Sequence, residues 1–409
     1  MRLALVLAAL VPTFLGLGCS VQAAERVALG ADVLLERESP FAEALAGKRL
    51  GLVTNPSGVD GELYPTADRL ATDSRFQLVQ LYGPEHGIRG EAAAGDQVGD
   101  EVDPLTGIPV ESLYGARKAP SPESLAKLDA VLFDIQDVGS RTYTYVSTLG
   151  ETMKACAAAK KPLYVLDRPN PIGGTRFEGG MVEDAYRSFI GWGPLPVTHG
   201  MTIGEVARFY EAQLGIGCEL VVVPMRGWRR EMAWDDTGLT WTSTSPHVPH
   251  ALQAYLYTCT GMVASSAKNL SDGVGTPMPF EVVASEFLEG NALADELDAL
   301  RLSGVRFQPI AFKPFYGKYK DVPLRGVRLV LDDPREFRPL HTAVAILVTL
   351  RKLHGERLEL QDATVIGKHW GSAAFLDQLR GGASIDEIER VWSDSLASFE
   401  RARASALIY

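Results

Sequence analysis

The chain has 409 residues, 46% of them hydrophobic, and its 40 Lys+Arg against 51 Asp+Glu give a net charge of -11. This acidity argues against nucleic acid as a partner, because a polyanion is bound by a cationic surface. Only four cysteines occur, so the fold must rest on a hydrophobic core and not on a disulfide framework.

The first residues have the pattern of a secretory signal. Arg2 precedes an apolar run, Leu3 to Leu17, that is too short to span a bilayer. We predict a signal peptide over residues 1–24, cleaved after Ala23, and therefore an exported protein that is periplasmic or secreted. Because the residues before Cys19 resemble a lipid-attachment motif, an anchor on Cys19 is the alternative. No later segment predicts an integral membrane span.

From Arg49 onward, short apolar strands alternate with amphipathic helices, which predicts an α/β fold with a parallel, Rossmann-like sheet. We expect strands at 49–54, 78–82, 130–135, 163–166 and 220–223, and helices at 65–72, 144–160 and 202–214. No GxGxxG sequence follows the first strand, so this fold class does not imply a dinucleotide, and we expect no cofactor.

The character of the chain changes beyond about Met225. A tryptophan-rich stretch, 228–249, and a Gly/Ser-rich loop, 265–279, precede a second, smaller α/β region with a strand at 326–331 and helices at 340–353 and 385–403. The tryptophans are interpreted as interdomain packing, with a platform for a sugar ring as the alternative. We predict a Rossmann-like catalytic domain over 25–245 and a C-terminal domain over 246–409 that closes a cleft.

Polar residues gather where the predicted strands end. Asn55 follows the first strand, Glu85 and His86 the second, Asp137 to Arg141 the third, and Asp167 to Asn170 the fourth. Ligands of open α/β sheets bind beyond the carboxyl ends of the strands, so these loops predict one shared rim.

Glu85 is the first candidate for a general acid. Gly83 and Gly87 bracket its turn and give the backbone the freedom to aim a carboxylate into a cleft. A carboxyl in a partly apolar pocket can deliver the proton that glycoside hydrolysis requires. The alternative is a turn carboxylate bonded to loop amides.

A second group must stabilise the developing positive charge or activate water, and Asp137, Asp167, Glu178, Tyr143 and Tyr145 are candidates. Asp137 ranks first because a carboxylate at the end of a buried strand is costly unless it is paired, hydrogen-bonded or ligand-bound. The competing interpretation is that Asp137 only pairs with Arg141.

His199 precedes a predicted helix for which Thr202 and Glu205 form a capping box, so Glu205 is expected to be structural. His199 itself is predicted to orient water or hold the substrate, with a histidine satisfied by backbone groups as the alternative. No histidine or acidic pair has the helical spacing of a zinc motif, so no metal is expected.

Several long motifs resemble the exo-β-N-acetylmuramidases of glycoside hydrolase family 171, formerly a family of unknown function. They are GLVTNPSGVD from Gly51, YGPEHGIRGE from Tyr82, DPLTGIPVESLYG from Asp103, DIQDVGSRTYTY from Asp134, VLDRPNP from Val165, HGMTIGE from His199 and PFE from Pro279. The resemblance implies a Rossmann-like domain, a smaller second domain, a cleft between them, no nucleotide or metal, and release of terminal N-acetylmuramic acid from peptidoglycan fragments.

The resemblance also implies site residues. It marks Glu85 as the catalytic acid and, with the strand-end argument, predicts Asp137, His199 and Tyr145 as its catalytic partners. The predicted substrate-binding residues are Asn55, His86, Arg141, Tyr143, Asp167, Arg168, Asn170 and Glu178. A planar guanidinium, from Arg141 or Arg168, would suit the lactyl carboxylate of muramic acid.

The second half departs from the family pattern. Ser245 to Pro249 stands where SPNMP is expected, and Ser266 to Thr276 stands where EGTNxSEGRGT is expected, so that a glutamate and an arginine are missing. These departures identify the chain as a divergent member of the family that it resembles. Since this loop is expected to close the cleft, they bear on specificity and activity. The alternative to an active hydrolase is an exported muropeptide-binding protein with weakened or lost turnover.

Overall fold

A seven-stranded sheet forms the centre of the first domain in the computed structural model, which describes residues 26–90 and 99–409. The predicted signal peptide and Cys19 lie outside these residues. The strand order is β3-β4-β2-β1-β5-β6-β7, and all neighbours are parallel except β3 and β4. The strands are β1 (Arg49–Thr54), β2 (Gln77–Gly83), β3 (Glu101–Val102), β4 (Pro109–Ser112), β5 (Ala130–Asp134), β6 (Leu163–Leu166) and β7 (Leu220–Val223).

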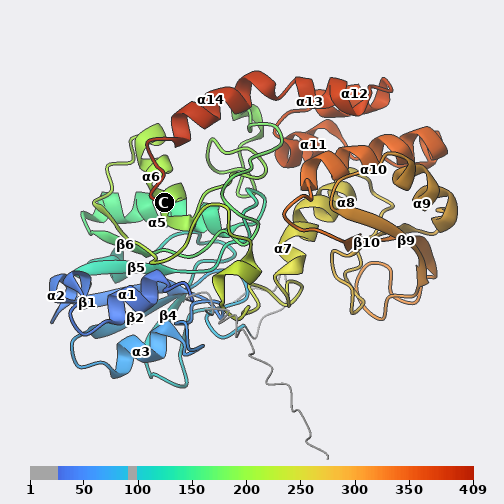
Figure 1. Cartoon of the computed structure of the whole chain (residues 1–409). Coiled ribbons are helices and arrows are strands. Elements are labelled where there is room, and N and C mark those ends of the chain that lie inside the picture. The colour runs from blue at the N-terminus through green and yellow to red at the C-terminus, as the bar shows by residue number, and fades with distance from the viewer. Residues whose placement is uncertain (1–25, 91–98) are drawn as a thin grey trace, which may run out of the picture.

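Helices cover both faces of this sheet (Figure 1). On one face lie α1 (Gly30–Leu35), α2 (Pro40–Leu45) and α3 (Thr66–Thr72), and on the other α4 (Pro122–Leu125), α5 (Tyr145–Ala159) and α6 (Ile203–Leu214). Strand β1 supplies Leu50 and Leu52 to the first core and Val53 to the second. Burial on both faces explains why the central strands are continuous apolar runs, and the predicted parallel sheet is confirmed.

The second domain has a three-stranded antiparallel sheet, β8-β10-β9, formed by β8 (Val282–Ser285), β9 (Val305–Phe312) and β10 (Leu324–Leu331). Its helices are α7 (Leu252–Leu256), α8 (Met262–Ser266), α9 (Gly290–Ala299), α10 (Pro339–His354), α11 (Ala363–Trp370), α12 (Ala374–Arg380), α13 (Ile385–Arg390) and α14 (Ser393–Arg403). A π-helical turn, Tyr257–Gly261, joins α7 to α8, and short 3-10 turns lie at Asp184–Tyr186, Trp234–Thr237 and Gly355–Arg357.

The predicted single helix over 385–403 is wrong, because the chain forms two helices there. Between them the backbone tightens: the amide of Trp392 donates to the carbonyl of Glu389, three residues back. This turn leaves Trp392 mostly buried, with its ring 6.1 Å from that of Trp370. The packing of the Trp392 indole thus favours two helices over the single helix that the apolar spacing of the sequence predicts.

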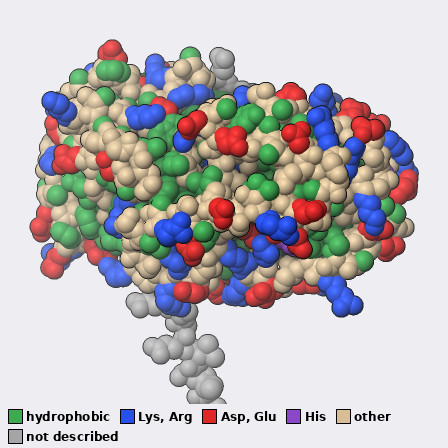
Figure 2. Space-filling view, turned by 90° about the horizontal axis from the view of Figure 1, so that it is seen from above, with side chains coloured by type: hydrophobic (Ala, Val, Ile, Leu, Met, Phe, Trp, Pro, Cys, Tyr) green, Lys and Arg blue, Asp and Glu red, His purple; other side chains and the backbone are tan. Residues whose placement is uncertain are grey.

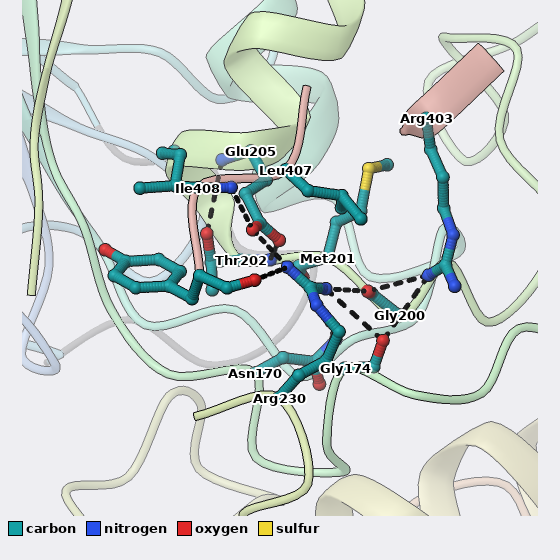
Figure 3. A network of polar contacts seen from close by, with 12 residues as sticks. Asn170, Gly174, Gly200, Met201, Thr202, Glu205, Arg230, Arg403, Leu407 and Ile408 are labelled. Atoms are coloured by element: carbon teal, nitrogen blue, oxygen red, sulfur yellow. Dashed lines mark hydrogen bonds and ion pairs between the residues drawn. The ribbon is translucent and has the colours of Figure 1, made fainter. Parts of the chain in front are cut away.

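The last helix returns from the second domain to the first (Figure 1). Phe399 of α14 packs edge-on against Phe209 of α6 and against Phe177. Figure 3 shows how the chain end is held there: Arg230 pairs with Glu205, which also accepts a hydrogen bond from the amide of Ile408 at 2.8 Å. The predicted Thr202–Glu205 capping box is present, so Glu205 is structural.

Charged side chains of both signs are interspersed over the face shown in Figure 2 and do not gather into a cationic patch there. Among the described residues, no helix is long and apolar enough to cross a membrane. The three cysteines in this part of the chain, Cys156, Cys218 and Cys259, are buried free thiols. Stability therefore comes from the packed cores, as composition indicates.

Candidate active site

The topology places the switch point of the sheet at the ends of β1 and β5, and the residues around it form the crevice region. The connection after β1 leads to β2 on one side, whereas the chain returns to β5 on the other, which makes this pair the switch point where α/β sheets bind ligands. Asn55 leaves β1 here, and its Oδ1 accepts bonds from the backbone nitrogen of Ser57 at 3.0 Å and from the Ser57 hydroxyl at 2.5 Å. Its amide nitrogen points toward the carbonyl of Thr244 at 3.5 Å.

Glu85 lies in the turn after β2 and is half-buried. The next residue, His86, has a φ of 74°, and Gly87 follows with a φ of 73°, so two successive residues adopt the left-handed conformation. A non-glycine residue there carries strain, which is often found where a loop serves a site. The carboxyl of Glu85 is within hydrogen-bonding reach of Tyr114, and its charge acts on Tyr145 and Tyr257. The half-buried carboxyl of Glu85 therefore lies near tyrosine hydroxyls.

Tyrosines line this part of the crevice. The ring of Tyr143 packs edge-on against Tyr145 at 4.9 Å and against Tyr257 at 5.2 Å. The hydroxyl of Tyr145 donates to the carbonyl of Thr244 at 2.5 Å, and that of Tyr143 lies 2.7 Å from the Thr244 hydroxyl. Burial raises the pKa of Tyr145 well above its usual value, and the pKa of Tyr257 to about 12. The phenols are therefore neutral hydrogen-bonding groups at ordinary pH.

Asp137 and His199 form a buried pair behind these tyrosines. Nδ1 of His199 accepts a bond from the amide of Met201 at 3.3 Å, so the ring proton sits on Nε2. Nε2 faces Oδ2 of Asp137 at 3.5 Å, and the same oxygen accepts a bond from the amide of Gly139 at 2.7 Å. The other carboxylate oxygen of Asp137 is buried and has no partner among the described residues.

The two predicted arginines are held by protein groups. Arg168 donates to both oxygens of Asp134, at 2.6 and 2.8 Å, and to the carbonyl of Val59. Arg141 is wholly buried, and its Nη2 donates to the carbonyl of His369 in the second domain at 2.5 Å. Within the described ranges it forms no ion pair with Asp137, so the pairing considered from the sequence is wrong. Burial lowers the pKa of Arg141 to about 10.

Three other predicted binding residues have partners away from the crevice tyrosines Tyr143, Tyr145 and Tyr257. Asp167 is wholly buried and accepts bonds from Gly204, Thr202 and Tyr409, the C-terminal residue. Asn170 donates to the carbonyl of Met201 at 3.0 Å. Glu178 joins the domains, because it pairs with Arg338 and accepts a bond from the amide of Leu340.

The crevice also contains residues that sequence reasoning missed: Tyr114, Thr244, Tyr257, His247 and Asp272. Tyr257 begins the π-helical turn, a feature common at functional sites, but no sequence signal marks it. Asp272 lies in the glycine-rich loop and, like Glu85, acts on Tyr257 through its charge. His247 and the predicted His86 act on each other electrostatically.

A cavity of about 390 Å³ opens beside Tyr257. Its lining comes mainly from the second domain, including Asp272, Phe280 and Lys318, while Thr142 comes from the first. The Tyr257 hydroxyl lies 3.3 Å from that of Thr142. The volume is within the range of pockets that hold small ligands. Within the described part of the chain, no group of three or more His, Cys, Asp and Glu side chains is placed to hold a metal.

Comparison with known proteins gives matches over both domains. The family model described as exo-β-N-acetylmuramidase NamZ, N-terminal, matches residues 50–252, and its C-terminal counterpart matches residues 255–409. The chain belongs to the NamZ family. It is 38% identical to the peptidoglycan β-N-acetylmuramidase NamZ of Bacillus subtilis strain 168, over 94% of this chain and 92% of that protein.

Solved structures of similar proteins have the same architecture. A DUF1343 family protein from Bacteroides fragilis NCTC 9343 has a TM-score of 0.86 and 36% identity, over 94% of this chain and 99% of that one. A second DUF1343 protein from the same strain has a TM-score of 0.74 and 25% identity, over the same shares. In this NamZ-family chain the unusual residue Ser266 lies outside the crevice: its hydroxyl is buried and bonds to the indole of Trp370 at 2.8 Å.

Proposed function

We propose that this protein is an exo-acting glycoside hydrolase that releases terminal, non-reducing N-acetylmuramic acid from peptidoglycan fragments during cell-wall turnover. The observation that carries the proposal is the position of Glu85. A member of a muramidase family carries this carboxyl after β2, the strand next to the switch point, beside neutral tyrosines of which Tyr257 lines a cavity the size of a small ligand.

Each group in the crevice has a distinct part in the proposed reaction. Glu85 donates its proton to the glycosidic oxygen as the bond to the leaving sugar breaks. The unpartnered oxygen of Asp137 stabilises the developing positive charge or accepts a proton from water, while the amide of Gly139 holds the other oxygen in place and His199 faces it. Tyr145 and Asn55 position the reacting sugar, since both are fixed by the Thr244 segment.

Export is part of the proposal. Residues 1–24 have the charge and apolar pattern of a signal peptide, and peptidoglycan lies outside the cytoplasmic membrane. We infer a periplasmic or secreted protein, with lipid attachment through Cys19 as the alternative. Expression of the natural gene followed by N-terminal sequencing of the mature protein distinguishes them, because cleavage after Ala23 removes Cys19 and lipidation retains it.

A muropeptide-binding protein with weak turnover is the second candidate. It is favoured by Val274, an apolar residue in the cavity where the family resemblance leads us to expect an arginine. Loss of that cation would weaken the stabilisation of the reacting sugar, while the rest of the cavity lining would still hold a ligand.

Kinetics on a chromogenic N-acetyl-β-muramide tests both candidates. A hydrolase releases the chromophore, and on a sugar-linked muramide, whose leaving group requires a proton, Glu85→Gln lowers kcat by about 10²- to 10⁴-fold while ligand binding is retained. A binding protein shows no rate for that substitution to remove. The matched control is Glu62→Gln, an exposed carboxylate paired with Arg26, for which no change is expected. Absence of release by the wild type would contradict the hydrolase.

A further inference from the structure

The cavity beside Tyr257 is lined with hydroxyl groups as well as apolar side chains. Thr142, Ser265, Ser271 and Tyr319 contribute hydroxyls, and Phe280 and Met262 contribute apolar surface. Sugars combine hydroxyl groups with an apolar ring face, so a wall of this mixed character suits a sugar ring. The cavity also adjoins Tyr257, on which the charge of Glu85 acts. A sugar in the cavity would therefore lie within reach of the catalytic crevice.

Three ionisable side chains other than the tyrosines line this cavity: Lys318, Asp272 and His369. Burial lowers the pKa of His369, which is therefore neutral at pH 7. Burial raises the pKa of Asp272, and the charges of His247 and Lys318 oppose that shift. Lys318 thus acts electrostatically on the cavity, and among its described lining residues it is the side chain that carries a full positive charge.

The ammonium group of Lys318 has bonding capacity to spare. It donates to the carbonyl of Lys268 and lies over the ring of Tyr319, with Nζ 4.8 Å from the ring centroid. Since an ammonium carries three N–H donors, one bond to a carbonyl leaves two donors for another acceptor. Neither Arg168 nor Arg141 lines this cavity: Arg168 donates to Asp134 and Val59, and Arg141 is wholly buried, with Nη2 bonded to the carbonyl of His369 and with Nε and Nη1 unpartnered among the described residues.

We propose that Lys318 binds the lactyl carboxylate of muramic acid, and thereby makes the cavity select muramic acid over N-acetylglucosamine, which has no such carboxylate. The inference rests on the proposed function for the identity of the sugar. It replaces Arg141 and Arg168, the cations expected from the sequence, by a lysine on the loop between β9 and β10.

Removing the ammonium should have two effects that add. The substrate carboxylate loses a charge-assisted hydrogen bond, and Asp272 in the same cavity loses the opposing charge of Lys318 and keeps only that of His247. Bonds to charged groups of this kind correspond to a change of about 10- to 100-fold in affinity. The affinity for N-acetylglucosamine should hardly change.

Equilibrium binding tests the inference without requiring turnover. Calorimetric titrations with N-acetylmuramic acid and with N-acetylglucosamine would be made on the wild type and on Lys318→Met, Lys318→Arg and Lys320→Met. Lys320 is an exposed lysine of the same loop that does not line the cavity, which makes it a matched control. We expect Lys318→Met to weaken only muramic acid binding, about 10- to 100-fold, Lys318→Arg to retain most of it, and Lys320→Met to retain all of it.

Equal affinity of Lys318→Met and wild type for N-acetylmuramic acid would overturn the inference, as would an equal loss for both sugars or a wild type that does not bind the acid. Thermal unfolding of each variant shows whether the loop is intact. Selective loss in a protein that hydrolyses no muramide would uphold the cation site and contradict the proposed function. A protein that hydrolyses the muramide but binds muramic acid equally well after Lys318→Met would uphold the proposed function and contradict the cation site.

Discussion

Replacement of Asp167 by asparagine should remove a pH dependence of folding. Burial raises the pKa of Asp167 to about 7, from 3.8. Between about pH 4 and pH 7 the folded protein keeps a proton that the unfolded chain has released, so this residue makes the free energy of unfolding fall as the pH rises. A difference of roughly three pKa units corresponds to about 4 kcal/mol, which we take as an upper value because buried sites relax.

Asparagine suits the hydrogen bonds of this position. Oδ1 of Asp167 accepts from the amides of Gly204 and Arg168, which the asparagine oxygen would continue to do. Oδ2 faces the hydroxyls of Thr202 and Tyr409, both at 2.8 Å, and each hydroxyl can accept a bond from an amide nitrogen. Relative to the wild type, Asp167→Asn should therefore gain about 2–3 kcal/mol between pH 4.5 and pH 8.

Urea unfolding of the mature protein at these two pH values, followed by circular dichroism, measures this gain. Asp129→Asn is the control, because the hydrogen bonds from Arg49 hold the pKa of exposed Asp129 below its usual value and outside the tested range. A wild type whose stability is the same at both pH values, or an Asp167→Asn variant with an unaltered pH dependence, would refute the reasoning.

Two further substitutions test the buried polar contacts. Tyr409→Phe removes a hydroxyl that donates to Asp167 and accepts from the amide of Met225 at 2.7 Å, and should lower the urea-unfolding free energy by about 1–3 kcal/mol; an equally stable variant would mean that the chain end contributes nothing. Arg168→Met leaves the buried carboxylate of Asp134 without its partner and should cost about 3–5 kcal/mol, measured in the same way. Muramide binding that fell without any loss of stability would instead place Arg168 in the substrate site.

The parallel sheet could be predicted because its central strands are buried on both faces and appear as uninterrupted apolar runs. Strands β3 and β4 could not, since they are short, lie at the edge of the sheet and contain Pro109 and two glutamates. The break between α13 and α14 was also missed, because it depends on where the Trp392 side chain packs and not on the local pattern.

The site was predictable only in part, for a related reason. A strand end indicates which residues lie at the rim, as for Asn55 and Glu85. It does not indicate which other protein groups hydrogen-bond to them. Asp167 is engaged by the hydroxyl of Tyr409, 242 residues away, and that contact exists only because α14 returns to the first domain. Tyr257 and Asp272 come from the second domain, whose approach to the crevice no local motif indicates.

The central claim is that Glu85 delivers a proton to the leaving oxygen. It is tested most directly by comparing wild type and Glu85→Gln on N-acetyl-β-muramides whose leaving groups differ in basicity. A dinitrophenolate leaves without a proton, whereas a sugar alkoxide requires one. We expect the substitution to lower kcat at least about 10²-fold more on the sugar-linked substrate than on the dinitrophenyl one. An equal loss on both would contradict it, because Glu85 would then act without donating a proton.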